Sequence, residues 1–176
     1  MRSETRRKVL VLAKGYPPDI GGVEQYSAEV ASRMARFGFR PIVVTQHSGA
    51  RGTARQAGVL VINVGSGSQP IVLLKMLGTL RRLTRSRRFA FALATTWRVA
   101  VPILLLRLPI RLGVTIHGRE VLTPSGPVAR IMRWVFARID TVFAVSDFTL
   151  REARGRGLLT HAQALRNWNG LAEKQE

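Results

Sequence analysis

The sequence predicts an α/β fold in which a parallel β-sheet is covered by helices on both faces. Short apolar runs of strand length alternate along the 176 residues with segments whose apolar residues recur at helical spacing. Strands that alternate with helices pair in parallel through right-handed crossovers. The apolar runs do not themselves alternate with polar residues, which is typical of strands buried on both faces.

The individual elements follow from these patterns. The predicted strands are residues 8–13, 41–45, 59–64, 89–95, 111–116 and 141–146, with one more short strand at 161–165. The predicted helices are residues 22–37, 71–85, 97–107, 128–139 and 147–154. Gly38 ends the first helix, Pro102 either kinks the third or moves its start, and Asp147 caps the last. Residues 46–58, 65–70, 117–120 and 123–127 are predicted loops. We expect one domain over 1–166, then a turn and polar tail over 167–176.

The charge balance is strongly basic. The chain has 28 lysines and arginines against 10 acidic residues, a formal net charge of +18. Such a surface attracts nucleic acid, anionic lipid or phosphorylated ligands. Most of the excess is arginine, which a high-GC genome also enriches, so codon usage is an alternative source for part of it.

The scarcity of metal-binding side chains limits the chemistry. The chain has no cysteine, which excludes disulfides, thiolate ligands and a cysteine nucleophile and suits a reducing, cytoplasmic compartment. His47, His117 and His161 are not at metal-ligand spacing, so no metal cofactor is expected. The apolar run that ends at Ala13 is too short for a signal peptide.

The loop between the first strand and the first helix is a candidate binding site. Gly21 and Gly22 lie where the helix begins, so a ligand can approach the main chain without a Cβ in the way. The free N–H groups and dipole of the helix favour an anion there. The alternative is an ordinary turn whose glycines serve geometry alone, and Glu24 in the first helical turn is expected to complement the dipole.

Other candidate residues follow the later strands. His117 directly follows an apolar strand, so its ring is expected at the edge where ligands bind in such sheets. There it could hydrogen-bond a sugar hydroxyl, or it could be a loop histidine with a local partner. Ser146 could donate to a phosphate or simply end its strand.

The helix over residues 71–85 has a basic side. Lys75, Arg81, Arg82, Arg85 and Arg88 lie opposite its apolar arc, and Ile71 and Leu74 lie among them. An apolar pair among arginines is typical of a membrane-surface helix. The alternative is a solvated basic face on a helix that packs on the sheet.

Three motifs in order resemble the N-terminal domain of glycosyltransferase family 4, the retaining GT-B enzymes. They are Gly21-Gly-Val-Glu24 after a Tyr-Pro-Pro loop, Val114-Thr-Ile-His-Gly118, and Phe143-Ala-Val-Ser146; Asn169-Gly170 also resembles the turn between the family's two domains. The resemblance implies a Rossmann-like, acceptor-binding half. It implies that Gly21 and Gly22 lie near the donor diphosphate and that His117 faces the reacting sugar, with Gly118 and Ser146 as further substrate-binding candidates.

The sequence departs from that family after the Asn-Gly turn. It lacks the donor-binding half, the paired glutamates and the Arg/Lys pair that neutralises the nucleotide diphosphate, and no proline precedes Asn169. Without the second half there is no closed cleft to stabilise the leaving diphosphate. We therefore expect this chain alone to transfer sugar very poorly or not at all, whether it is a fragment, a truncated product or half of a split enzyme.

The leading functional prediction is the acceptor-binding half of a glycosyltransferase. Its expected partners are a nucleotide-sugar donor as co-substrate, a glycan or lipid-linked acceptor at the cytoplasmic membrane face, and a separate C-terminal domain. The alternative is a non-catalytic basic domain that binds anionic membrane or nucleic acid. Nucleic acid ranks last because no aromatic residues accompany the basic run. A different nucleotide-dependent enzyme is disfavoured because the GxGxxG fingerprint is missing.

Overall fold

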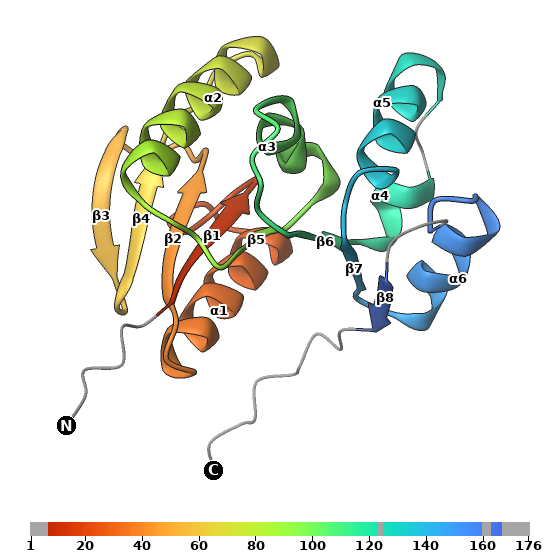
Figure 1. Cartoon of the computed structure of the whole chain (residues 1–176), viewed down its shortest axis with the longest axis horizontal. Helices are drawn as coiled ribbons and strands as arrows, with labels where there is room; N and C mark the ends of the chain where they lie inside the picture. Colours follow the sequence, from red (N-terminus) through yellow and green to blue (C-terminus); the bar gives the residue numbers. More distant parts are fainter. Residues whose placement is uncertain (1–6, 123–124, 160–162, 167–176) are drawn as a thin grey trace.

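The fold is an α/β domain built on one eight-stranded sheet. The structure, a computed structural model, describes residues 7–122, 125–159 and 163–166. The strand order is β3-β4-β2-β1-β5-β6-β7-β8, and every neighbouring pair is parallel except β3–β4 (Figure 1). The strands are β1 Lys8–Ala13, β2 Arg40–Thr45, β3 Gly52–Gln56, β4 Val59–Asn63, β5 Phe91–Ala94, β6 Leu112–Ile116, β7 Thr141–Ala144 and β8 Gln163–Arg166. The predicted Rossmann-like parallel sheet is confirmed.

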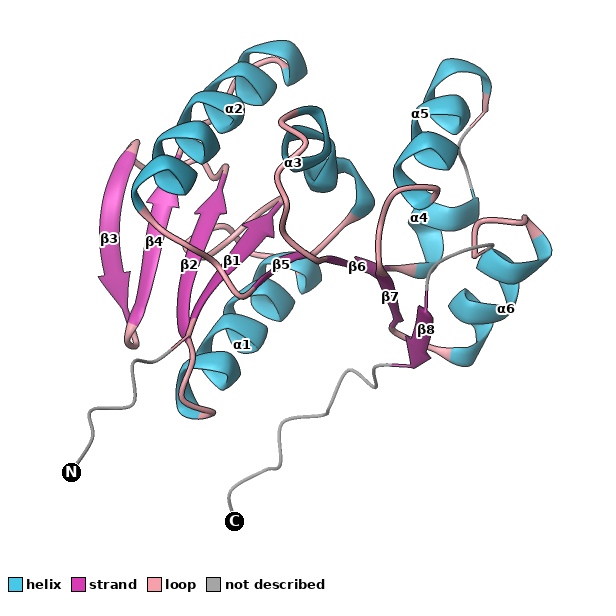
Figure 2. Ribbon diagram, viewed as in Figure 1, coloured by secondary structure: helices cyan, strands magenta, loops and turns pink. Residues whose placement is uncertain are grey.

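Helices cover both faces of this sheet. The helices are α1 Gly22–Arg36, α2 Gln69–Ser86, the 3₁₀ helix η1 Trp97–Ala100, α3 Val101–Leu105, α4 Gly118–Leu122, α5 Gly126–Phe136 and α6 Asp147–Gly155. Helix α1 lies on one face, whereas α2 and α3 lie on the other (Figure 2). None of the helices in the described ranges is long and apolar enough to cross a membrane.

Strand β1 contributes side chains to two hydrophobic cores, one on each face of the sheet. Successive side chains of a strand point to opposite faces. In β1, Leu10 and Leu12 belong to the large cluster beneath α2 and α3, whereas Val11 and Ala13 belong to the smaller cluster beneath α1. All four residues are completely buried. The strand therefore needs apolar residues at every position, which is why its sequence lacks alternation.

One strand was not predicted. Residues 46–58 were expected to be a loop, but β3 forms within them and pairs antiparallel with β4. All five residues of β3 are exposed, so no hydrophobic pattern marks the strand. The connecting residues Ala57 and Gly58 have φ of 46° and 78°, as a two-residue hairpin turn requires.

Smaller corrections concern helix ends. The segment predicted as one helix over 97–107 is η1 followed by α3, with Pro102 in the first turn of α3, so the proline moves a start and does not make a kink. Residues 118–120, expected in a loop, begin α4. The cap of α6 is Ser146, not Asp147, because the Ser146 hydroxyl accepts a hydrogen bond from Thr149 N. The predicted turn at 167–170 and the tail lie outside the described residues.

Candidate functional site

The segments that contain the predicted site residues follow parallel strands of the sheet. Lys14 follows β1, Gln46 follows β2, Thr95 follows β5, His117 follows β6 and Val145 follows β7. Because these strands are parallel, the segments that follow them emerge at the same edge. This edge therefore contains every residue that the sequence marked as substrate-binding.

The carboxylate of Glu24 packs against the loop that joins β1 to α1, residues 14–22, called here the glycine loop. A Cβ at Gly15 would lie 2.3 Å from Glu24 Oε1, and a Cβ at Gly21 would lie 2.2 Å from Glu24 Oε2. A side chain at either position would displace the Glu24 carboxylate, which folds back against the loop from the first turn of α1. In contrast, no atom lies within 4 Å of the Cβ position at Gly22. The exposed surface at the start of α1 is thus open at Gly22, where the sequence predicted ligand approach.

Polar side chains fix the neighbouring loops. Asp19 accepts hydrogen bonds from Ser48 N at 3.1 Å and from the Ser48 hydroxyl, and these bonds lower the pKa of the Asp19 carboxyl. Buried Asn63, the last residue of β4, accepts from His47 N at 3.1 Å and Gly65 N at 2.9 Å. Its amide nitrogen also donates to Gly49 O at 2.9 Å. These hydrogen bonds hold the segments that follow β2 and β4 against the glycine loop and against each other.

A ring contact joins the glycine-loop helix to the histidine. Tyr26, one turn into α1, packs edge-on against His117 with the ring centroids 5.4 Å apart. The Tyr26 hydroxyl lies 3.1 Å from the hydroxyl of buried Thr115 on β6. This contact puts the start of α1 and His117 on the same side of the molecule, although they are far apart in sequence.

Burial and one hydrogen bond set the charge and the tautomer of His117. Its Nε2 lies 3.0 Å from Thr95 O, and because a carbonyl only accepts, Nε2 carries the proton. Burial lowers the pKa of the ring, and the bond to Thr95 partly opposes that shift. His117 is accordingly neutral near pH 7 with a lone pair on Nδ1. That atom can accept a hydrogen bond from a ligand hydroxyl.

A pocket of about 380 Å³ lies beside these loops. Lys14 and Arg98 line it together with Glu120, whose Oε2 is buried and has no hydrogen-bond partner among the described residues. Burial raises the pKa of Glu120 to about 7, while Lys14, a hydrogen bond with the His117 backbone and Arg98 act in the opposite direction. The pocket thus offers two cations and one carboxyl that titrates near neutrality.

The sequence prediction missed a role for Glu120. The available signal was an acidic side chain three residues after His117 at a strand end, in a chain with only 10 acidic residues. The residues that line the pocket with it, such as Lys14 and Arg98, come from distant parts of the chain, so the sequence alone does not show that the carboxyl is desolvated.

Gly118 and Ser146 lie together at the start of α6. A Cβ at Gly118 would lie 3.4 Å from Thr149 Oγ1, an ordinary van der Waals distance, so packing against α6 does not require a glycine there. The Ser146 hydroxyl caps that helix, with Thr149 N at 3.2 Å and Thr149 Oγ1 at 2.9 Å. The cap gives Ser146 a structural role, and the substrate-binding role of both residues stays a prediction.

The basic side of α2 lies apart from the glycine loop. Arg81, Arg82, Arg85 and Arg88 are exposed, whereas Lys75 is half-buried with its ammonium 3.4 Å from Ser66 O. Ile71 and Leu74 are 49% and 68% exposed, so the apolar pair does lie outside the core. A pocket of about 690 Å³ separates the C-terminal ends of α2 and α3.

Comparison with solved structures identifies the fold. Sucrose-phosphate synthase from Thermosynechococcus elongatus has a TM-score of 0.72 at 12% identity, over 92% of this chain and 47% of that one. A glycosyltransferase from Rickettsia africae ESF-5 has a TM-score of 0.62 at 16% identity, over 93% of this chain and 43% of that one. UDP-N-acetylglucosamine 2-epimerase from Rickettsia bellii has a TM-score of 0.59 at 10% identity, over 90% and 44%. This chain therefore spans less than half the length of these three proteins.

The sequence comparison gives the family. No curated protein sequence matches the chain. A family model, described as glycosyl transferase 4-like domain, matches residues 21–168, which is most of the chain and extends from the glycine loop past β8. The fold and this match agree with the resemblance found in the motifs. The chain has the Rossmann-like fold of the N-terminal domain of GT-B glycosyltransferases, and it belongs to the glycosyl transferase 4-like domain family.

Proposed function

We propose that this domain is the acceptor-binding half of a retaining glycosyltransferase that takes a sugar from a nucleotide-sugar donor. The observation that carries the proposal is the contact between Tyr26 and His117, with ring centroids 5.4 Å apart. It brings the open helix start at Gly22 and the histidine to one edge of the sheet, next to the pocket of Lys14, Arg98 and Glu120.

Under this proposal, the backbone at Gly22 and the side chains of the site bind different parts of the donor and the acceptor. The backbone at Gly22 meets the diphosphate of the donor, where the N-terminal dipole of α1 favours an anion. Nδ1 of neutral His117 accepts a hydrogen bond from a hydroxyl of the reacting sugar. Lys14 and Arg98 bind an anionic group of the acceptor, and Glu120 accepts from an acceptor hydroxyl once it is ionised. A second domain is needed to enclose these groups.

A substitution at Gly22 tests the open surface. Gly22→Val leaves the free domain folded, because nothing lies within 4 Å of the new Cβ, but it obstructs the approach of a ligand to the main chain. We expect binding of uridine and guanosine diphosphate sugars, followed by ligand-observed NMR, to weaken about tenfold or more, a loss of roughly 1.4 kcal/mol.

The matched control is Gly78→Val on α2. Gly78 has equally open surroundings but is remote from the predicted site. We expect it to bind like the original chain, and His117→Ala to bind like Gly22→Val. Equal binding by the Gly22 and Gly78 variants would contradict the proposal that the glycine loop holds the ligand.

A second candidate function is attachment to an anionic membrane at the cytoplasmic face. The observations that favour it are exposed Ile71 and Leu74 near the start of α2 and half-exposed Leu105 at the end of α3, beside the arginines of the last turns of α2. Arg81, Arg85 and Arg88 line the pocket between these two helix ends. Apolar side chains that enter the headgroup region, surrounded by cations, are typical of interfacial binding.

Vesicle flotation separates membrane binding from simple charge attraction. In vesicles containing phosphatidylglycerol, the triple variant Arg81→Gln, Arg82→Gln and Arg85→Gln is expected to lose most binding, since each cation near the surface contributes about 1 kcal/mol. The control removes the same charge elsewhere, at exposed Arg130, Arg133 and Arg151. Equal losses in both triple variants would show that only the net charge matters.

A further inference from the structure

A third pocket, larger than the two described above, lies at the opposite edge of the sheet. Its volume is about 800 Å³, and its lining includes the first residues of β1 and β2 and the turn between β3 and β4. These are the N-terminal ends of the parallel strands. Neither the glycine loop nor His117 lines this pocket. It is therefore separate from the site proposed for sugar transfer.

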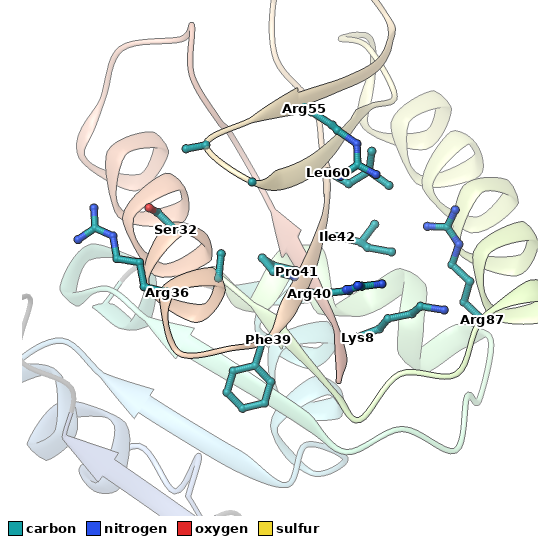
Figure 3. Close-up of a pocket in the computed structure, with 13 residues that line it drawn as sticks. Lys8, Ser32, Arg36, Phe39, Arg40, Pro41, Ile42, Arg55, Leu60 and Arg87 are labelled. Carbon is teal, nitrogen blue, oxygen red and sulfur yellow. The ribbon is translucent and has the colours of Figure 1, made fainter. Parts of the chain in front are cut away.

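Four cations from four elements converge in this pocket. They are Lys8 on β1, Arg40 on β2, Arg55 on β3 and Arg87 directly after α2, here called the cationic cradle. Figure 3 shows their side chains extending into the same space between the strands and the end of α2. Arg36 also lines the pocket but extends away from the cradle, on the side of α1 (Figure 3).

Among the residues that the structure describes, no carboxylate lines the cradle. The lining contains no acidic residue, and the ion pairs among the described residues, Glu29–Arg33 and Glu152–Arg156, lie on α1 and α6. The macrodipole of α2 accounts for a cation at Arg87, because this residue follows the negative helix end. It does not account for Lys8, Arg40 and Arg55, which come from strands. Their convergence places like charges together at a cost that a bound anion would offset.

We propose that the cationic cradle binds an organic diphosphate. A guanidinium group can donate two parallel hydrogen bonds to the oxygens of one phosphate. Four cations that approach from different elements can therefore contact both phosphates of a diphosphate, whereas a single phosphate would leave some of them without a partner. The pocket is much larger than a single phosphate, and its walls include the apolar side chains of Ile42 and Leu60. An organic group attached to the diphosphate can pack there. A soluble diphosphate ester and the diphosphate headgroup of a lipid share this chemistry.

Inorganic pyrophosphate is the probe for the phosphate part. Isothermal titration of the 176-residue chain at 150 mM salt is expected to show binding with Kd below about 1 mM. The triple variant Arg40→Gln, Arg55→Gln and Arg87→Gln should bind at least about tenfold more weakly, because the bidentate contacts are lost. The three arginines are at least partly exposed, so the fold should tolerate the changes, which thermal unfolding checks.

The control has the same net charge without the cradle changes. Arg130→Gln, Arg133→Gln and Arg151→Gln replace exposed arginines on α5 and α6. Unchanged pyrophosphate binding in this control, together with the loss in the cradle variant, supports the proposal. Equal loss in both variants, or no binding to the original chain up to 10 mM pyrophosphate (a limit chosen at about ten times the expected Kd), would overturn it.

Competition identifies the source of the diphosphate. Vesicles of phosphatidylcholine that contain a polyprenyl diphosphate are added to the chain with bound pyrophosphate. Displacement by these vesicles, but not by phosphatidylcholine alone, assigns the cradle to a lipid headgroup. Displacement only by soluble nucleoside diphosphates assigns it to a free ester. The Gly22→Val variant should bind pyrophosphate at the cradle normally, which separates this inference from the proposed function.

Discussion

Replacing Glu120 with glutamine should stabilise the domain at pH 8 and change little at pH 4.5. Burial raises the pKa of this carboxyl from 4.5 to about 7 in the folded chain. Between those two pH values the folded state holds a proton that the unfolded state has released. The stabilising contribution of Glu120 is therefore fully present below pH 4.5 and is lost as the pH rises through about 7. The loss amounts to roughly 3 kcal/mol at most.

Urea unfolding of both proteins across this pH range measures the effect. His117 acts in the opposite direction: its pKa is lowered from 6.5, so its contribution is lost as the pH falls below that value. The difference between the original chain and Glu120→Gln cancels the histidine and isolates the carboxyl. Glu152→Gln is the matched control, because Glu152 pairs with Arg156 at 3.6 Å on the surface of α6. A difference that does not vary with pH would show that Glu120 is not desolvated.

The chain of 176 residues, on its own, should bind nucleotide sugars without turning them over. The proposed site is open on the side where a donor-binding domain would close it, and it supplies few groups to stabilise the charge on a leaving diphosphate. Loss of a single preorganised donor of this kind typically costs about 10²–10³ in rate. A coupled assay for released nucleoside diphosphate, run with a panel of UDP and GDP sugars, should therefore show no turnover above the background.

A complete two-domain glycosyltransferase provides the positive control for that assay. The decisive comparison is between the original chain and His117→Ala. Saturable turnover by the original chain that disappears with His117→Ala would contradict the expectation and would mean that this domain is sufficient for catalysis. Equal background rates in both proteins agree with a half that needs a partner.

The sequence predicted the buried elements well because burial leaves a pattern. The first strand was placed at 8–13, where β1 lies, and the first helix was placed at 22–37, one residue longer than α1. The strand is apolar at consecutive positions because both of its faces are buried, and the helix is apolar at helical spacing because one of its faces packs on the sheet. The exposed strand β3 left no such pattern, and its only local signal was the two-residue turn at Ala57 and Gly58.

The candidate site was only partly predictable, for a related reason. The rule that loops after parallel strands share one edge placed His117 near Gly22 without any structure. The contact that joins them depends on Tyr26, and no spacing in the sequence shows that this ring packs against His117. The raised pKa of Glu120 depends on how deeply its neighbours bury it, and no spacing in the sequence encodes that depth.

The strand β3 has a further consequence for behaviour in solution. Antiparallel and fully exposed, it forms the outer border of the sheet, and the residue before it and the fourth residue within it are Arg51 and Arg55. Unprotected borders of sheets recruit strands from other molecules and start aggregation, and positive charges on the border discourage this. Replacing both arginines with valine would remove that protection, turning the border into a template on which copies of the chain could stack.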